Sequence, residues 1–380
     1  DHRDLHSFPT RRSSDLAEVH IMIEYVEIRG ADTRIIGIID TASAIIWHSV
    51  YFGVGDFEIH TAATSDYIDL LKIGRYITRP DDDEVGIIEK IEITESAEDG
   101  ATLTASGRFA KSLLERRLIY NLSGTTNTAT ILRGNVEKAV RKVVEANAIR
   151  CEFDDKRNMS ILELNSAKGF PQVIVSEDGK TAEKQVSYGN LLTYTDGVLE
   201  EYGLSAKCLL SGEKFLYTIY AGIDRSINNT AGNVPLIFSK EYDNLTTSDY
   251  VYNISTEKNV ALIGGEGEGL ERFYSLIGGN NAGLNRREVF IDASSINKTY
   301  KDENDVEQAY TVEEYKTLLD AKGKQDLAPL VVTETFEGTV DTTNGNYSYK
   351  NDFELGDIVT VQSNDRSEER RVGKECRSRW

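Results

Sequence analysis

The feature that most constrains the fold is a dense succession of short apolar, β-branched runs separated by turn residues. Runs such as Arg34–Asp40 (RIIGIID) and Ala44–Tyr51 (AIIWHSVY) have the length and composition of β-strands. Polar turns such as Arg79–Glu84 (RPDDDE) interrupt these runs at short intervals. No apolar run approaches the roughly 20 residues needed to cross a bilayer. The pattern predicts a β-rich, multi-domain chain of the α+β class with no membrane insertion.

Helical periodicity is confined to a few stretches. One helix is predicted to begin after Asn135 with valines on a single stripe, and a second is predicted within 188–202. Thr311 and Glu314 have the spacing of a capping box, which predicts a third helix ending at Gly323. The helices are therefore few and widely spaced among the strands.

Composition shifts along the chain predict three domains. The strand-rich segment 22–120 is expected to form a first barrel-like domain. The polar run Asn121–Thr130 marks a boundary, after which 121–186 is expected to form a small, inserted α/β domain. Residues 187–365 are expected to form a second β-rich domain with helices, truncated at its carboxy-terminal end.

Both ends of the chain look foreign. Residues 1–16 and 366–380 can be encoded by reverse-complementary DNA and resemble translated sequencing adapter. Residues 17–21 can be encoded by a bacterial ribosome-binding site placed before Met22. We therefore expect 1–21 and 366–380 to be non-native and the gene to continue beyond Asp365.

The charge balance excludes one class of function. The chain has 43 Lys and Arg against 63 Asp and Glu, a net charge of −20. An acidic chain of this kind does not bind nucleic acid through a basic face. Its three cysteines are too few for a disulfide scaffold, which fits assembly in a reducing cytoplasm.

The glycine-rich run GGEGEG (Gly264–Gly269) superficially matches a phosphate-binding loop. No Lys-Ser/Thr pair follows it, and Glu266 and Glu268 would repel a phosphate group. We interpret the run as a tight structural turn, where glycine permits a positive φ.

An acidic segment has the spacing of a calcium-binding loop. Asp81, Asp83, Gly86 and Glu92 stand at offsets 1, 3, 6 and 12. Val85 occupies an offset that requires an oxygen ligand, so we interpret the segment as a solvated hairpin turn. A second acidic patch is interpreted in the same way, as a loop tip: Asp302, Glu303 and Asp305.

Candidate catalytic residues are sparse. His48 and His60 lie in strand patterns without the cysteine or HExxH spacing of a zinc site. A Ser-His-Asp arrangement stays open, because triad members converge only in the fold. Cys151 and Cys208 are interpreted as small, partly buried residues.

Two short basic pairs, Arg116–Arg117 and Arg286–Arg287, are expected to make ion pairs or interface contacts. Because carboxylates are so numerous in this chain, two that lie near one another do not indicate the catalytic pair of a glycosidase. We therefore predict no catalytic, cofactor-binding or metal-binding residue and no cofactor. This favours a structural or binding protein over an enzyme.

Several segments together resemble one protein family. They are GVGDFEI (Gly53–Ile59), IGRYITRPDDDEVGIIEKIEI (Ile73–Ile93), SGRFAKSLLERRLI (Ser106–Ile119), KNVALIGGEGEGLERF (Lys258–Phe273), GLNRREVFIDA (Gly283–Ala293) and DFELGDIVTV (Asp352–Val361). Over 22–365 the chain resembles siphovirus tail proteins, the ReqiPepy-type minor tail proteins of phages and prophages of Gram-positive bacteria. It departs from them in ending soon after the LGDIVTV strand.

The resemblance implies a baseplate hub protein in the virion tail, assembled in the host bacterial cytoplasm. It implies a homotrimeric ring of barrel-like domains that continues the tail tube and contacts the distal tail protein and the tape-measure protein. A lumen lined by carboxylates would repel the phosphates of passing DNA. Closed symmetry would also bury strand edges that otherwise invite open-ended association.

Two other functions stay open. A tail-associated peptidoglycan hydrolase or peptidase would need a catalytic module, and none is recognisable in 22–365. A carbohydrate-binding module would show clustered, exposed tryptophans, whereas Trp47 lies in an apolar strand.

Overall fold

The computed structural model describes residues 25–96, 100–123, 126–127, 129–175, 183–301, 306–340, 347–363, 366–372 and 374–379. These residues form two compact units, which we call the larger unit (25–248 and 337–379) and the inserted unit (249–336). The chain leaves the larger unit through β17 (Leu245–Asn253) and returns through its pairing partner β23 (Thr333–Val340). The predicted division at 120/121 and 186/187 stays a prediction.

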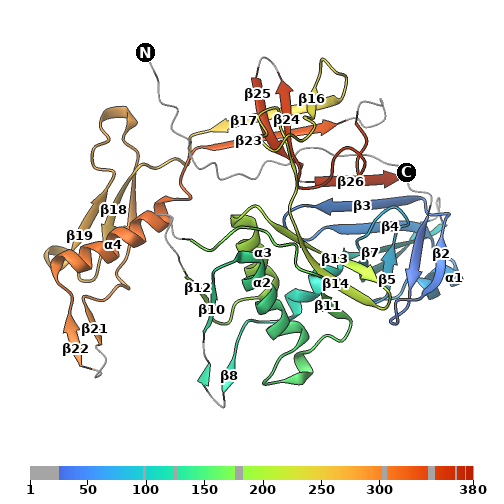
Figure 1. The fold of residues 1–380 in the computed structure, drawn as a ribbon, viewed down its shortest axis with the longest axis horizontal. Helices are drawn as coiled ribbons and strands as arrows, with labels where there is room; N and C mark the ends of the chain where they lie inside the picture. Colours follow the sequence, from blue (N-terminus) through green and yellow to red (C-terminus); the bar gives the residue numbers. More distant parts are fainter. Residues whose placement is uncertain are drawn as a thin grey trace. The chain divides into compact units, whose positions relative to one another are not determined.

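The larger unit contains an eight-stranded antiparallel sheet (Figure 1). Its strands, in spatial order, are β2 (Ile35–Ile39), β1 (Val26–Arg29), β5 (Tyr76–Thr78), β6 (Gly86–Ser96), β7 (Gly100–Phe109), β4 (Asp56–Ala62), β3 (Ala44–Val50) and β26 (Lys374–Arg379). The β-rich α+β class predicted from the sequence is confirmed. No sheet formed by the described residues closes into a barrel, so that part of the prediction is not met.

Alternation along these strands buries one face of the sheet. Trp47, Phe57 and Phe109 meet at its centre, with ring centroids 5.8 Å apart for Trp47–Phe57 and 4.8 Å for Trp47–Phe109. The short helix α1 (Ser65–Leu70), capped by Thr64, follows β4. This aromatic cluster is the core of the sheet.

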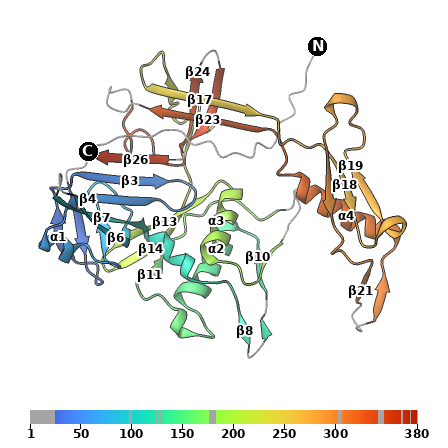
Figure 2. The same cartoon turned by 180° about the vertical axis from the view of Figure 1, so that it is seen from behind.

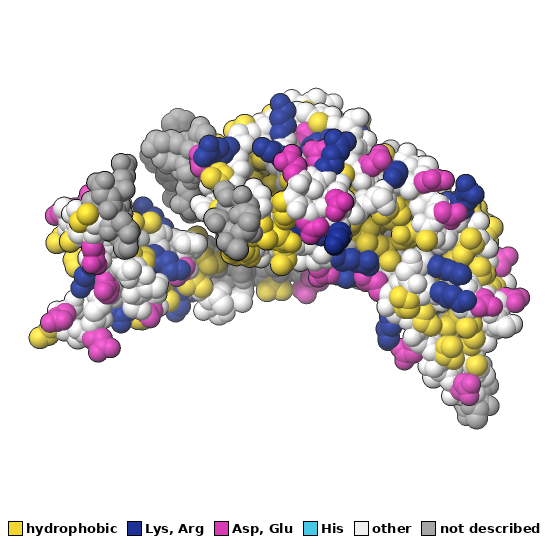
Figure 3. Space-filling model, turned by 90° about the horizontal axis from the view of Figure 1, so that it is seen from below, with side chains coloured by type: hydrophobic (Ala, Val, Ile, Leu, Met, Phe, Trp, Pro, Cys, Tyr) yellow, Lys and Arg dark blue, Asp and Glu magenta, His cyan; other side chains and the backbone are white. Residues whose placement is uncertain are grey.

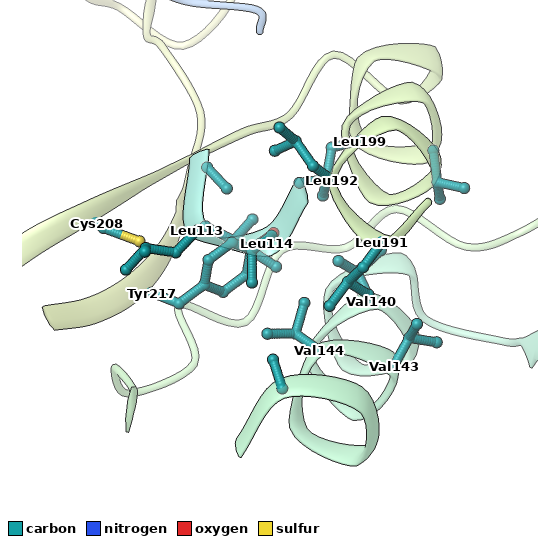
Figure 4. Packing of buried hydrophobic residues seen from close by; sticks show 14 of the residues in the cluster. Leu113, Leu114, Val140, Val143, Val144, Leu191, Leu192, Leu199, Cys208 and Tyr217 are labelled. Atoms are coloured by element: carbon teal, nitrogen blue, oxygen red, sulfur yellow. The ribbon is translucent and has the colours of Figure 1, made fainter. Parts of the chain in front are cut away.

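A second core of the larger unit lies between helices and a three-stranded sheet (Figures 1 and 2). Its elements are the 3₁₀ helix η1 (Ala110–Arg116), α2 (Val136–Val144), α3 (Leu191–Glu201), β11 (Leu162–Leu164), β13 (Ser205–Ser211) and β14 (Lys214–Tyr220). Figure 4 shows valines of α2 and leucines of α3 packed in one core with Leu113, Leu114 and Tyr217. Asn135 and Asn190 cap the two α-helices, as local side-chain acceptors do at helix starts.

Shorter elements complete the larger unit. They are β8 (Leu122–Ser123), β9 (Thr126–Asn127), β10 (Thr130–Arg133), the π-helix η2 (Glu145–Ile149), η3 (Asp155–Arg157), β12 (Glu183–Val186), β15 (Asp224–Arg225), β16 (Ile237–Ser239), β24 (Ile358–Ser363) and β25 (Arg366–Arg371). Strands β15, β16 and β25 all pair with β24.

The inserted unit packs one helix on one sheet. The sheet has the order β19 (Tyr274–Ile277), β18 (Val260–Gly264), β20 (Glu288–Asp292), and α4 (Val312–Leu327) covers one of its faces. The turns η4 (Gly269–Glu271) and η5 (Gly283–Asn285) and the pair β21 (Thr299–Lys301) and β22 (Glu307–Ala309) complete the unit. The predicted capping box of Thr311 and Glu314 is present at the start of α4.

Two local predictions are wrong. The predicted helix stop at Gly323 is an interior position of α4, which continues to Leu327 because Gly323 packs against Ile263 and Ile277. The run at 172–175 (QVIV), whose β-branched residues predict a strand, forms isolated bridges instead, with Val173 opposite Asn135. The turn residues at 98–100 and 344–346 predict two hairpin turns, and these stretches lie wholly or largely outside the described residues.

Candidate assembly surfaces

The glycine-rich run 264–269 forms the connection between β18 and β19. A Cβ on Gly264 would lie 2.7 Å from Nε of Arg272, whose guanidinium lies across this strand and donates to the carbonyl oxygens of Gly264 and Gly265. Gly267 has a φ of +105°, which side-chain-bearing residues rarely adopt. The run is occupied by the protein's own arginine and offers no phosphate cradle.

The acidic segment at 79–84 also makes intramolecular contacts. Asp81 forms an ion pair with the buried guanidinium of Arg79 at 2.6 Å, and Glu92 lies on β6. Among the described residues, no group of three His, Cys, Asp or Glu side chains has the geometry to hold a metal ion. The other acidic patch, Asp302, Glu303 and Asp305, lies outside the described residues.

A small cavity of about 60 Å³ lies behind this acidic turn. Glu84, Lys207 and Glu354 line it, and Lys350 closes it through an ion pair with Asp82 at 3.2 Å. Desolvation, reinforced by the Asp82 carboxylate, raises the pKa of Glu84 to about 7. Glu84 is therefore the carboxyl group in this cavity whose charged form burial disfavours.

Of the two imidazoles that the structure describes, His60 lies between a hydroxyl and a carboxylate. Its Nε2 is 2.5 Å from Glu58 and its Nδ1 is 3.2 Å from the hydroxyl of Thr104. The group lies on an open sheet face, where the His60 and Glu58 side chains are 32% and 42% exposed. Thr104 belongs to a strand paired on both sides, so the ladder engages the backbone amides that an oxyanion would need.

The surroundings of the remaining candidate residues indicate structural roles. Cys151 and Cys208 are buried, and burial raises the pKa of the Cys208 thiol to about 12, which leaves it unreactive. Trp47 is fully buried and presents no surface to a saccharide.

The basic pairs are engaged within the chain. Arg286 pairs with Glu288 at 2.5 Å and Arg287 with Glu257 at 3.3 Å. Arg117 donates to the carbonyl oxygen of Arg157 at 2.7 Å. The contacts of Arg286 and Arg287 are ion pairs, one of the two alternatives predicted, whereas the contact of Arg117 is a hydrogen bond to the backbone.

The edge of the eight-stranded sheet at β2 carries exposed apolar side chains. Ile35, Ile36 and Ile38 are 48%, 44% and 50% exposed, and within the described part of the chain β2 pairs only with β1. Gly37 lets α1 approach this strand, since a Cβ there would lie 2.5 Å from Leu70 Cδ2. We call these three isoleucines the β2 edge.

The face of the same sheet opposite its core is polar. We call it the polar face, and its members include Asp56, Glu58, His60, Lys90, Glu92 and Thr104. Glu58 lies opposite Ser106, and both His60 and Glu92 lie opposite Thr104, so these side chains share one face. On the side of the molecule seen in Figure 3, acidic and basic side chains are interleaved with apolar patches.

The family model described as "Siphovirus ReqiPepy6 Gp37-like protein" matches residues 25–374. The chain belongs to this family. It is therefore a siphovirus tail protein with a structural role in the phage tail, as the sequence resemblance predicted. The family is one of structural tail proteins, which favours a role other than catalysis.

Three solved structures similar to this chain are described as tail proteins. One is the tail protein from Neisseria meningitidis MC58, with 14% identity over 92% of this chain and 90% of that chain and a TM-score of 0.47. A second is the 43 kDa tail protein of prophage MuSo2 from Shewanella oneidensis, with 13% identity, 92% and 93% coverage and a TM-score of 0.47. A third is the prophage tail protein gp18 from Listeria monocytogenes EGD-e, with 10% identity, 92% and 89% coverage and a TM-score of 0.44.

A comparison with curated proteins finds no significant match. Among the residues that the structure describes, no helix combines the length and the apolar character that crossing a bilayer requires.

Proposed function

We propose that this tail protein is a baseplate hub subunit. Three copies form a ring that continues the tail tube, contacts the distal tail protein and the tape-measure protein, and lets DNA pass. Assembly takes place in the host cytoplasm. The observation that carries this proposal is the β2 edge, because an unprotected apolar strand edge is what a ring contact would bury.

The direction of the strands limits how neighbouring copies meet. Every neighbouring pair in the sheet is antiparallel, and an even number of steps separates β2 from β3, so these two strands run in the same direction. In a ring with one rotation axis, the β2 edge of one copy would pair in parallel with β3 of the next. Strand β26 occupies that edge of β3 here, and we propose that it stands in the position of the neighbouring strand.

We further propose that the polar face lines the lumen of the ring. Its carboxylates, including Glu58 and Glu92, are partly exposed and would repel the phosphates of DNA. Reversing both charges (Glu58→Lys with Glu92→Lys) should make the protein retard duplex DNA in a gel at low salt. The matched control is Glu200→Lys with Glu241→Lys, two exposed carboxylates outside the polar face, and equal retardation by both variants would contradict the lumen assignment.

The mass of the protein in solution tests the ring. The chain ending at Asp365 frees β3 and should sediment as a trimer, and Ile36→Lys with Ile38→Lys in that chain should return it to a monomer. The control is Ile223→Lys, an isoleucine that is 46% exposed outside any strand. A chain that stays monomeric at every concentration would refute the ring.

We also propose that the chain has no catalytic activity. The hydroxyl, imidazole and carboxylate of Thr104, His60 and Glu58 are the groups to test, with purified protein on bacterial cell walls. Release of soluble peptidoglycan fragments, abolished by His60→Gln, would establish the hydrolase instead.

A further inference from the structure

The sheet of the inserted unit exposes apolar side chains on the face opposite α4. Leu262 of β18 lies opposite Leu276 of β19 and Phe290 of β20, so these half-exposed side chains form one row across the sheet. The residues that alternate with them, such as Ala261 and Ile263, belong to the core beneath α4. Because neighbouring strands lie about 4.8 Å apart, the row spans about 10 Å.

A second row beside the first combines an aromatic ring with polar groups. Tyr274 of β19 and Asp292 of β20 both lie opposite Gly264. The guanidinium of Arg272 occupies the place that a side chain of Gly264 would take, and it pairs with Asp292. Its Cζ lies 5.9 Å from the ring centroid of Tyr274 and 5.4 Å from that of Phe290. The guanidinium is thus held in place between two aromatic rings.

Polar atoms on this face keep capacity for further hydrogen bonds. Nε and Nη2 of Arg272 are engaged within the unit, whereas its Nη1 has no partner among the described residues. The side chain of Asp292 is 61% exposed, and a carboxylate has more lone pairs than its present contacts use. A donor and an acceptor therefore lie beside the apolar row.

The charges at this face are paired. Arg272 pairs with Asp292, and Arg286 pairs with Glu288 at 2.5 Å at the start of β20. Two cations and two carboxylates cancel, although the whole chain has a net charge of −20. Electrostatic complementarity therefore favours an uncharged ligand over a charged one.

The apolar area of this face is small for a protein interface. Four half-exposed side chains contribute a few hundred Å², whereas each partner of a stable protein complex buries about 800 Å². The face therefore suits a ligand with a narrower footprint than a folded protein.

We propose that these two rows bind an uncharged, β-1,4-linked polysaccharide. In such a chain the pyranose substituents are equatorial, so the axial C–H bonds form an apolar face that stacks on an aromatic ring. The hydroxyl groups at the ring edge both donate and accept hydrogen bonds. Phe290 and Tyr274 provide the rings, and Arg272 and Asp292 provide partners for the hydroxyl groups.

The geometry of the face matches such a chain. A row of about 10 Å accommodates two linked sugar residues, and a flat sheet face suits a flat, extended polymer. Tyr274 and Phe290 take the part of the exposed tryptophans that the sequence lacks. The site involves neither the β2 edge nor the polar face, so the proposal stands or fails independently of the ring.

The test uses full-length protein and three uncharged probes, the β-1,4-linked hexamers of glucose, mannose and N-acetylglucosamine. At least one hexamer should bind saturably by calorimetry, with the same affinity at low and high salt, because the ligand carries no charge. Failure of all three hexamers, or an affinity that falls steeply with salt, would overturn the proposal. If all three fail and Phe290→Leu abolishes self-association of the protein in sedimentation, the face is a protein contact instead.

A matched pair of variants tests the aromatic ring. Phe290→Leu keeps an apolar side chain but removes the ring, and it should weaken binding of the hexamer about fivefold, in the range of one aromatic contact. Phe290→Tyr keeps the ring and should keep the affinity. Equal affinities of the two variants would refute stacking on this ring. Tyr252→Ala removes an aromatic side chain that is 60% exposed on β17, outside the two rows, and should leave binding unchanged.

Discussion

The sheets of the two units differ in where they expose apolar side chains. In the larger unit, the face of the eight-stranded sheet opposite the core is polar, and the apolar exposure is concentrated at the β2 edge. In the inserted unit, α4 covers one face of the three-stranded sheet, and the opposite face exposes Leu262, Leu276 and Phe290 by 40%, 46% and 52%. The first sheet thus exposes an apolar strand edge, whereas the second exposes an apolar face.

This difference predicts different responses to substitution. A strand edge is sensitive to charge and to backbone blocking, because its contacts are hydrogen bonds between strands. An apolar face is sensitive to the area removed, because its contacts are non-directional. Substitutions in the core and on the surface of each unit can therefore distinguish the contacts of a strand edge from those of an apolar face.

The largest expected effect is at the core of the eight-stranded sheet. Trp47→Ala should lower the free energy of unfolding of the larger unit by about 4 kcal/mol, because Trp47 is fully buried against Phe57 and Phe109. Urea unfolding followed by amide exchange would measure the loss in β3, β4 and β7. Protection of β18–β20 should persist, and its simultaneous loss would show that the two units unfold as one.

The second effect depends on pH and is confined to the larger unit. Because the folded-state pKa of Glu84 is raised from 4.5 to about 7, the folded protein binds more protons than the unfolded chain between these values. Its stability should therefore fall as the pH rises from about 4.5 to 7, as the ionised carboxyl becomes desolvated. Glu84→Gln should flatten this dependence in thermal unfolding, whereas Glu354→Gln in the same cavity should leave the slope in place.

A feature of the fold can be predicted from the sequence when the residues that cause it lie close together along the chain. The cap at Asn135 and the box of Thr311 and Glu314 were predictable because donor and acceptor lie within one helical turn. The open sheet was not predictable, because β1 pairs with β5 across a stretch of chain whose alternation gives no information about its partner.

The same distinction between local and long-range causes applies to the candidate surfaces. An apolar run at 35–39 was visible in the sequence, but that it forms an edge depends on which strand lies beside it. The contact of His60 with Glu58 follows from β4 alternation alone, whereas its contact with Thr104 needs the β4–β7 register. Nothing in the sequence indicated the apolar face of the inserted unit, because its side chains converge only through the pairing of β18 with β19 and β20.

A third prediction compares one glycine in each unit. A Cβ at Gly323 of α4 would lie 2.6 Å from Ile263 Cγ1, so Gly323→Ala should destabilise the inserted unit by about 1 kcal/mol after the gain in helix propensity. Gly197 of α3 is exposed and has no atom within 4 Å of such a Cβ, so Gly197→Ala should stabilise the larger unit by about 0.5–1 kcal/mol. Thermal melts of the two variants should shift in opposite directions, and shifts of the same sign would contradict the packing described for α4.

The smallest effect on stability should come from the apolar face of the inserted unit, and it is the sharpest test of the comparison. Leu276→Thr with Phe290→Ser should change the free energy of unfolding by less than about 0.5 kcal/mol, because both side chains are half exposed. The same variant should be more soluble, since an exposed apolar patch promotes association. A decrease of 2 kcal/mol or more in the free energy of unfolding would mean that other parts of the chain cover this face. The contrast between an exposed strand edge in one unit and an exposed apolar face in the other would then be wrong.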